Sequence, residues 1–277
     1  MIRLSITLPF LVPFSCLTNC EHFAHSMKQK FGCFVNDAPT STCNIIKVTR
    51  KNFIDQHNLS PGLSSYLLSY GEHHIYTNSP LQAVSEIIYQ YTNFSPSIFL
   101  LHGAAVEYAG HAYLFVAATS NGKTTLTSYL TSNGFGYITD DCILLDRYTF
   151  NIYPCTTPLH LRKGGISILK EYNISPDSIV PLCDPSFYRY VYTPPNCVSN
   201  ALPIGKIFFI TITNKDNHIE EMNTIERMSS LLKSSLFEYP LNRQYIQFIA
   251  KLSSIPCYKL SYSDMRYVSE VLYNEST

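Results

Sequence analysis

The chain has 277 residues, with 20 basic and 20 acidic side chains and a formal net charge of zero. This balance excludes an interaction with nucleic acid driven by a strongly basic surface. The length allows one large domain or two smaller ones. The nine cysteines show no disulfide-type spacing, which favours reduced thiols and a cytoplasmic location.

The N-terminal part, residues 1–95, is predicted to form an accessory α/β region, and residues 96–277 to form the main domain. Alternating polarity over residues 2–8 predicts a strand at the start of the chain. The apolar stretch that follows is interrupted by Pro9 and Pro13 and is too short to cross a membrane. We therefore expect no membrane partner.

The segments that follow combine short strands with one helix. Residues 44–49 and 73–77 are predicted strands, and residues 80–91 are predicted to form a helix with its proline in the first turn. Residues 99–108 and 111–117 are rich in apolar and β-branched side chains and are joined by an Ala-Gly turn. This pattern predicts a hairpin whose second strand is buried.

The most informative segment, residues 117–124, ends in Gly-Lys-Thr. In a phosphate-binding loop, backbone N–H groups surround the phosphates of a nucleotide such as ATP, the Lys neutralises them, and the Thr hydroxyl ligates Mg²⁺. Ala117 takes the place of the first glycine, which is acceptable where the position needs only a small residue. A helix is predicted over residues 124–133, so the loop has the strand-loop-helix context that the motif requires. The residues predicted to bind the nucleotide are Thr119, Ser120, Asn121, Gly122, Lys123, Thr124 and Thr125.

An acidic pair, Asp140 and Asp141, interrupts the next predicted strand, residues 137–145. Burying two carboxylates in a strand is costly unless they have a metal, a cation or a raised pKa. In a regular strand the two side chains would leave opposite faces, so that one reaches the metal and the phosphates while the other meets a substrate. Two exposed acids at a strand end are the alternative interpretation.

The remainder of the chain continues the α/β pattern. A proline-rich segment, residues 192–197, is predicted to be a surface loop. The elements expected after it are a central strand at 205–213, helices at 224–236 and 240–253, a strand at 257–262 and a closing helix.

The segment that starts at His102 and runs through the loop to the Asp pair resembles the catalytic core of HPr kinase/phosphorylase. It is more similar to the short HPr-kinase-like proteins of peptide-modification gene clusters, including those that phosphorylate lasso-peptide precursors. The resemblance covers residues 98–165 and implies an α/β phosphate-loop kinase core of the HPr kinase/PEP carboxykinase type. The family's signature for protein recognition and phosphorolysis has no match here, so neither phosphorylase activity nor HPr as substrate is implied.

The same resemblance implies roles for individual residues. Lys123 and Thr124 would bind ATP and Mg²⁺, and one carboxylate of the acidic pair would accept the proton of a serine hydroxyl. We take Asp140 as this base and Asp141 as the partner on the metal side. The implied catalytic residues are Asp140, Asp141, His102 and Arg162, and the implied metal ligands are Thr124 and Asp141.

The expected activity is transfer of the γ-phosphate of ATP to a serine of a peptide or small-protein acceptor, such as the precursor of a modified peptide. The chain has no His-Arg-Asp or Asp-Phe-Gly motif, which argues against a eukaryotic-type protein kinase. Two alternatives remain: a kinase for a small molecule such as free serine, and a non-catalytic nucleotide-binding or scaffold protein. The sequence allows a homo-oligomer.

Overall fold

A computed structural model describes most of the chain. The described residues are 1–9, 13–37, 44–52, 64–93, 97–118, 120–174, 179–182, 189–236 and 242–274. Contacts divide the chain into two compact units, residues 1–95 with 180–191 and residues 96–179 with 192–277. The predicted division lies at the same first boundary, but it assigned residues 180–191 to the second part.

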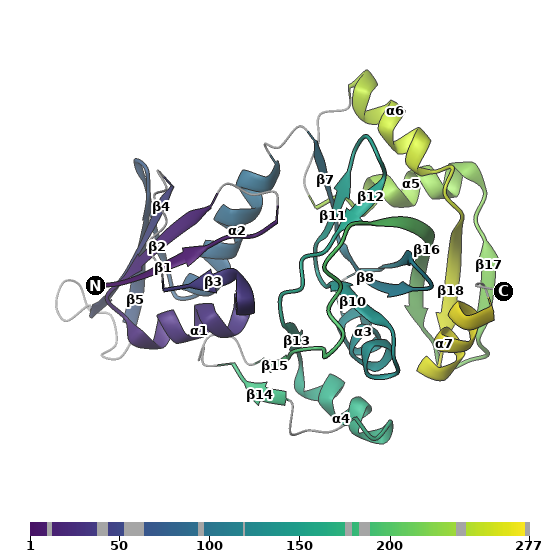
Figure 1. The fold of residues 1–277 in the computed structure, drawn as a ribbon, viewed down its shortest axis with the longest axis horizontal. Coiled ribbons are helices and arrows are strands. Elements are labelled where there is room, and N and C mark those ends of the chain that lie inside the picture. The colour runs from purple at the N-terminus through teal and green to yellow at the C-terminus, as the bar shows by residue number, and fades with distance from the viewer. Residues whose placement is uncertain are drawn as a thin grey trace. The chain divides into compact units, whose positions relative to one another are not determined.

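The first unit contains a six-stranded sheet in the order β3-β1-β2-β4-β5-β6 (Figure 1). Its strands are β1 (Ile2–Ile6), β2 (Phe14–Thr18), β3 (Val35–Asn36), β4 (Ile45–Asn52), β5 (Ser64–Tyr70) and β6 (His73–Thr77), and its helices are α1 (Glu21–Phe31), the 3₁₀ turn η1 (Gly32–Phe34) and α2 (Pro80–Asn93). The short strands β14 (Ile179–Pro181) and β15 (Tyr190–Tyr192) flank residues 182–189. Apolar side chains such as Leu4, Ile6 and Val48 are fully buried and form the core of the unit.

The second unit is built on a nine-stranded sheet in which β10-β8-β9-β16-β12-β11-β7 form a continuous order and β18 pairs with β16 and β17. The strands of the sheet are β7 (Ile98–Leu101), β8 (Gly103–Tyr108), β9 (His111–Val116), β10 (Gly136–Thr139), β11 (Ile143–Asp146), β12 (Asn151–Tyr153), β16 (Leu202–Ile212), β17 (His218–Glu221) and β18 (Cys257–Tyr262). The unit also contains β13 (Leu159–Leu161), which is not part of this sheet. Its helices are α3 (Lys123–Ser132), α4 (Lys163–Glu171), α5 (Thr224–Lys233), α6 (Arg243–Leu252) and α7 (Met265–Asn274).

A cluster of buried hydrophobic side chains forms the core of this unit and holds the strands next to the predicted phosphate loop, residues 117–124. Leu114 and Val116 of β9 and Ile207 of β16 are almost completely buried, as expected for a strand that is covered on its faces. At the other end of the cluster, Phe99 of β7 packs on Phe248 of α6, with ring centroids 4.9 Å apart. The sequence pattern predicted β9, β16 and α6, but it predicted residues 99–108 as one strand of a hairpin, and the structure divides them into β7, which pairs with β11, and β8, which pairs with β9.

The single strand predicted over residues 137–145 is wrong. The segment forms two strands, β10, which pairs with β8, and β11, which pairs with β7 and β12. Between them the chain turns at the acidic pair, where Cys142 donates a backbone hydrogen bond of 2.8 Å to the carbonyl of Asp140 and Asp141 has a φ of 64°. At this turn Asp141 is exposed and Asp140 is buried, so only one of the two carboxylates is removed from water.

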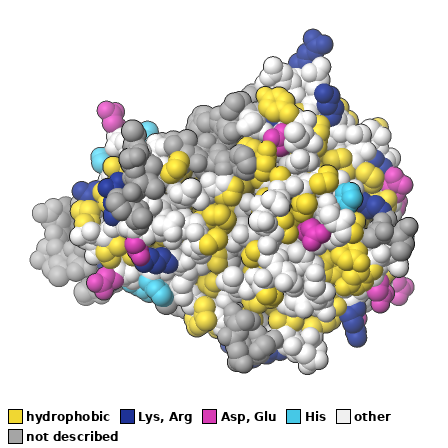
Figure 2. Space-filling view, in the orientation of Figure 1, with side chains coloured by type: hydrophobic (Ala, Val, Ile, Leu, Met, Phe, Trp, Pro, Cys, Tyr) yellow, Lys and Arg dark blue, Asp and Glu magenta, His cyan; other side chains and the backbone are white. Residues whose placement is uncertain are grey.

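The surface of the described residues carries few charges. In Figure 2, basic and acidic side chains are scattered over the visible face and are separated by hydrophobic and uncharged polar ones. No helix in the described part of the chain is both long and apolar enough to span a membrane.

Candidate functional site

The predicted phosphate loop joins β9 to α3 and lies at the carboxyl ends of three parallel strands. Strand β16 runs parallel to both β9 and β18, so these strands end at the same edge of the sheet. The contacts agree with this, because a Cβ on Gly122 would lie 2.6 Å from Cδ1 of Ile212 and 3.3 Å from the hydroxyl of Tyr262. In open α/β sheets, ligands bind at such an edge. Ile212 and Tyr262 lie in predicted strands, but the sequence did not predict them as residues of the site.

The loop backbone has the left-handed conformations that allow a tight turn before a helix. Ser120 and Gly122 have φ angles of 71° and 76°, and Gly122 is the N-cap of α3, which has no side-chain cap hydrogen bond. The uncapped N–H groups of a helix N-terminus favour an anion such as phosphate. Ala117 is not among the described residues with positive φ, so this position does not need glycine. Thr119 lies outside the described residues.

Lys123 is only 5% exposed, and its ammonium group is held by three acceptors. It donates hydrogen bonds to the carbonyls of Ala117, at 2.8 Å, and Ala118, at 3.2 Å, and it lies 3.2 Å from Nε2 of His102. Burial lowers the pKa of Lys123, and the charges of the acidic pair oppose this shift. The loop therefore places one cation at the N-terminus of α3.

His102 lies between β7 and β8 and touches both the loop Lys and the acidic turn. Its Nδ1 is 3.0 Å from the carbonyl oxygen of Asp141, and its backbone N–H donates a 2.8 Å hydrogen bond to the carbonyl of Ser234. Burial and then the charge of Lys123 lower the pKa of His102, which favours the neutral ring. These contacts bring His102 together with Lys123 and Asp141, as the sequence resemblance implied.

The two carboxylates of the acidic pair lie in different environments. Asp140 is 8% exposed, and its Oδ2 accepts a 2.7 Å hydrogen bond from the hydroxyl of Thr124. Its Oδ1 is also buried and has no hydrogen-bond partner among the described residues. Burial, and next the charge of Asp141, raises the pKa of Asp140 to about 8. Asp141 is exposed. The geometry thus pairs Asp140, rather than Asp141, with the predicted metal-binding hydroxyl.

Arg162 reaches the other side of the loop. Its guanidinium donates a 2.8 Å hydrogen bond to the hydroxyl of Ser120, and the residue itself is the N-cap of α4. Helix α4 lies against α3 (Figure 1), and a Cβ on Gly165 would come within 2.8 Å of Oγ1 of Thr125. Thr125, one of the predicted nucleotide-binding residues, therefore faces α4. Another, Asn121, donates a long backbone hydrogen bond of 3.4 Å to the carbonyl of Ala118.

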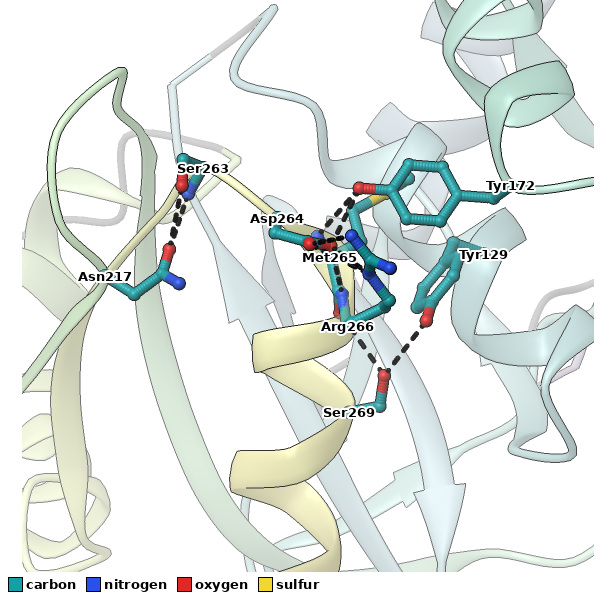
Figure 3. A network of polar contacts seen from close by, with 8 residues as sticks. All are labelled: Tyr129, Tyr172, Asn217, Ser263, Asp264, Met265, Arg266 and Ser269. Atoms are coloured by element: carbon teal, nitrogen blue, oxygen red, sulfur yellow. Dashed lines mark hydrogen bonds and ion pairs between the residues drawn. The ribbon is translucent and has the colours of Figure 1, made fainter.

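A polar network connects α3, α4 and α7 (Figure 3). Tyr172, which follows α4, donates a 2.9 Å hydrogen bond to Asp264, whose carboxylate also accepts from the guanidinium of Arg266. Ser269 of α7 reaches the hydroxyl of Tyr129 on α3 at 3.4 Å. These contacts fix the helix that carries the loop, although none of these residues was predicted from the sequence.

The residues present fit a magnesium ion bound together with a nucleotide. In the part of the chain that the structure describes, no group of three or more His, Cys, Asp or Glu side chains is placed to hold a metal alone. Mg²⁺ at nucleotide sites needs only one or two protein oxygens, with the rest from phosphates and water. The buried, unpaired Oδ1 of Asp140 and the hydroxyl of Thr124 are such oxygens.

Comparisons with known proteins give a limited result. No family model and no curated protein matches the chain. Among solved structures, the HPr(Ser) kinase/phosphatase from Coxiella burnetii is similar at 13% identity, with a TM-score of 0.34 over 63% of this chain and 88% of that chain. The mixed α/β architecture is shown by the chain's own sheets and helices.

Proposed function

We propose that the chain is an ATP-dependent kinase that transfers the γ-phosphate to a serine hydroxyl of a peptide or small protein. The observation that carries the proposal is the contact of Thr124 with Asp140, directly after a buried Lys123 at the N-terminus of α3. Together they offer a cation, an anion-favouring helix end and two oxygens for a metal at one place. P-loop phosphoryl-transfer enzymes use this combination to hold nucleotide phosphates and Mg²⁺.

Each residue has a physical task in this proposal. The α3 N-terminus and Lys123 bind the phosphates, and Thr124 with Asp140 holds Mg²⁺, which when bound neutralises charge on the phosphates. Asp141 is exposed at the same turn, where an acceptor hydroxyl can approach, and we assign it the role of proton acceptor. Arg162 is hydrogen-bonded to Ser120 of the loop, and we assign it contact with the transferred group. The roles of the two aspartates are therefore exchanged relative to the sequence prediction.

The acceptor class is supported by the sequence resemblance to short HPr-kinase-like proteins that act on peptides. The test is to incubate the purified chain with Mg²⁺, γ-labelled ATP and serine-containing peptides, and to measure ADP and labelled peptide. Label in an acid-stable ester on serine is the expected result. Label found only on free serine, or only in inorganic phosphate, would contradict the peptide-kinase proposal.

The matched control uses two Lys→Ala variants. Lys123→Ala should lose transfer because the charge at the phosphates is removed. Lys170→Ala, at an exposed position of α4, should keep it. Equal activity of the two variants would disprove the assignment of the loop as the nucleotide site.

A further inference from the structure

The side chain of Lys123 is long and flexible, yet the structure holds it in one place. Fixing a Lys side chain costs about 1.5–2 kcal/mol of rotamer entropy, so an immobile Lys needs several partners. An ammonium group has three N–H donors and no acceptor. Among the described residues the acceptors are three: the carbonyls of Ala117 and Ala118 and the Nε2 atom of His102. Two belong to the loop backbone, and only one is a side chain.

The contact with Lys123 determines which nitrogen of His102 carries the proton. Because the ammonium can only donate, Nε2 must be the unprotonated nitrogen of the ring. The proton then resides on Nδ1, which donates to the carbonyl of Asp141 at 3.0 Å. In this neutral tautomer both ring nitrogens are used. The ring therefore has no free nitrogen for a proton from an incoming hydroxyl.

The ring is held by backbone groups from separate segments. The Asp141 carbonyl is oriented by the turn between β10 and β11, where Asp141 has a φ of 64°. The backbone N–H of His102 is bonded to the Ser234 carbonyl, just after α5. The His102 side chain is thus fixed at its ring by Asp141 and at its backbone by Ser234, so its Nε2 atom stays in one place as an acceptor for Lys123.

We propose that His102 is a positioning residue, which as a neutral acceptor holds the Lys123 ammonium at the loop where nucleotide phosphates would bind, and which does not itself transfer a proton. This inference rests on the proposed nucleotide site, although it does not depend on the identity of the acceptor. It makes the His102 ring part of phosphate binding, with Asp141 contributing through its backbone carbonyl as well as its carboxylate.

Two conservative variants separate positioning from proton transfer. In His102→Gln, the side-chain oxygen can reach the place of Nε2 and accept from Lys123, whereas in His102→Asn the shorter side chain reaches only the place of Nδ1. Neither amide can act as a proton-transfer group near neutral pH. Positioning therefore predicts different behaviour of the two variants, and proton transfer predicts the same behaviour.

The first measurement is ADP binding by calorimetry with the full chain in EDTA, together with thermal unfolding of each variant. We expect His102→Asn to bind ADP at least fivefold more weakly than the wild type, and His102→Gln to remain within about twofold. A merely structural role would lower the melting temperature without this separation of ADP affinities. Unchanged or tighter ADP binding by a folded His102→Asn protein would overturn the proposal.

The second measurement is the steady-state rate with ATP. Positioning predicts that kcat/KM for ATP follows the ADP affinities, with His102→Gln recovering most of the loss seen in His102→Asn. Proton transfer by His102 predicts instead a similar fall of about 10²-fold or more in kcat for both variants, with ADP affinity unchanged, and this would overturn the proposal. If the wild type binds no ADP, the proposed nucleotide site itself fails, which is a different result from equal binding by all three proteins.

Discussion

The hydroxyl of Thr124 donates a 2.7 Å hydrogen bond to Oδ2 of Asp140. This contact joins the first turn of α3 to the end of β10, two segments that are sixteen residues apart. It leaves Oδ1 of Asp140 buried and unpaired among the described residues, a state that costs free energy unless a ligand satisfies it. A metal bound next to the nucleotide would satisfy it.

The first prediction separates the two aspartates by their dependence on magnesium. Asp140→Asn should reduce phosphoryl transfer by at least about 10²-fold, and the magnesium concentration for half-maximal rate should rise, because the metal-side carboxylate is lost. Asp141→Asn should reduce the rate without changing the magnesium dependence. The measurement is the initial rate over a range of Mg²⁺ concentrations at saturating ATP.

The control for this pair is ADP binding in EDTA. Both variants should bind metal-free ADP at least as well as the wild type, because Asp141→Asn removes a negative charge near the phosphates and Asp140→Asn removes a carboxyl that can become charged there. A shift in magnesium dependence in Asp141→Asn but not in Asp140→Asn would restore the assignment predicted from the sequence.

The second prediction concerns stability and pH. Burial, and next the Asp141 charge, raises the pKa of Asp140 from 3.8 to about 8, so the folded state favours the neutral carboxyl. Its contribution to stability is fully present below about pH 4 and is lost as the pH rises through about 8. In EDTA, the melting temperature of Asp140→Asn should therefore rise relative to the wild type between pH 5 and pH 9. A constant difference between the two proteins over this range would contradict the raised pKa.

The local pattern of the sequence predicted the elements around the site because each is specified by neighbouring residues. The apolar run of β9 and the periodic helix α3 are found within one residue of the expected ends, and β18 is found at the predicted residues. The turn at Asp141 could not be predicted, since nothing in an apolar run with two acids shows that the second acid has positive φ. That conformation depends on the separate pairing of β10 and β11.

The sequence predicted which residues form the candidate site, but it did not predict the contacts between them. Gly-Lys-Thr and the acidic pair have local signatures, so Lys123, Thr124 and Asp140 could be identified as a group. The contact between Lys123 and His102 and the place of Ile212 beside Gly122 depend on the order of strands in the sheet. Strand order is a long-range property that spacing along the chain does not reveal.

The third prediction compares two glycines with nearly the same backbone. Gly122 and Gly110 have φ angles of 76° and 78°, but a Cβ on Gly122 meets Ile212, whereas a Cβ on Gly110 meets nothing within 4 Å. Both Gly→Ala variants should lose about 1–2 kcal/mol of stability from the left-handed backbone. Only Gly122→Ala should also weaken ADP binding, by at least fivefold. Denaturant unfolding and calorimetry give the two quantities, and equal ADP affinities would show that the loop tolerates the change.

The fourth prediction tests the network that holds α3. Tyr172→Phe removes the hydroxyl that donates to Asp264 at 2.9 Å (Figure 3), and this should cost about 1 kcal/mol of stability. ADP affinity should stay within twofold, because Tyr172 is not among the residues proposed to bind the nucleotide. Tyr148→Phe, at a residue that is 76% exposed, is the control and should change stability by less than about 0.5 kcal/mol. A similar effect of both substitutions on unfolding in denaturant would mean that the Tyr172 contact contributes little.

The last prediction concerns Ala117, which replaces the first glycine of the usual loop pattern. Its φ is not positive, so Ala117→Gly should leave ADP affinity within twofold of the wild type and lower stability by about 0.5–1 kcal/mol, through the greater freedom of the unfolded chain. Ala109 provides a control of opposite sign, because its φ is 51°. Ala109→Gly relieves a left-handed alanine and should raise stability by up to about 1 kcal/mol. Denaturant unfolding of both variants gives the two signs, and a severalfold gain in ADP affinity for Ala117→Gly would show instead that alanine weakens the loop.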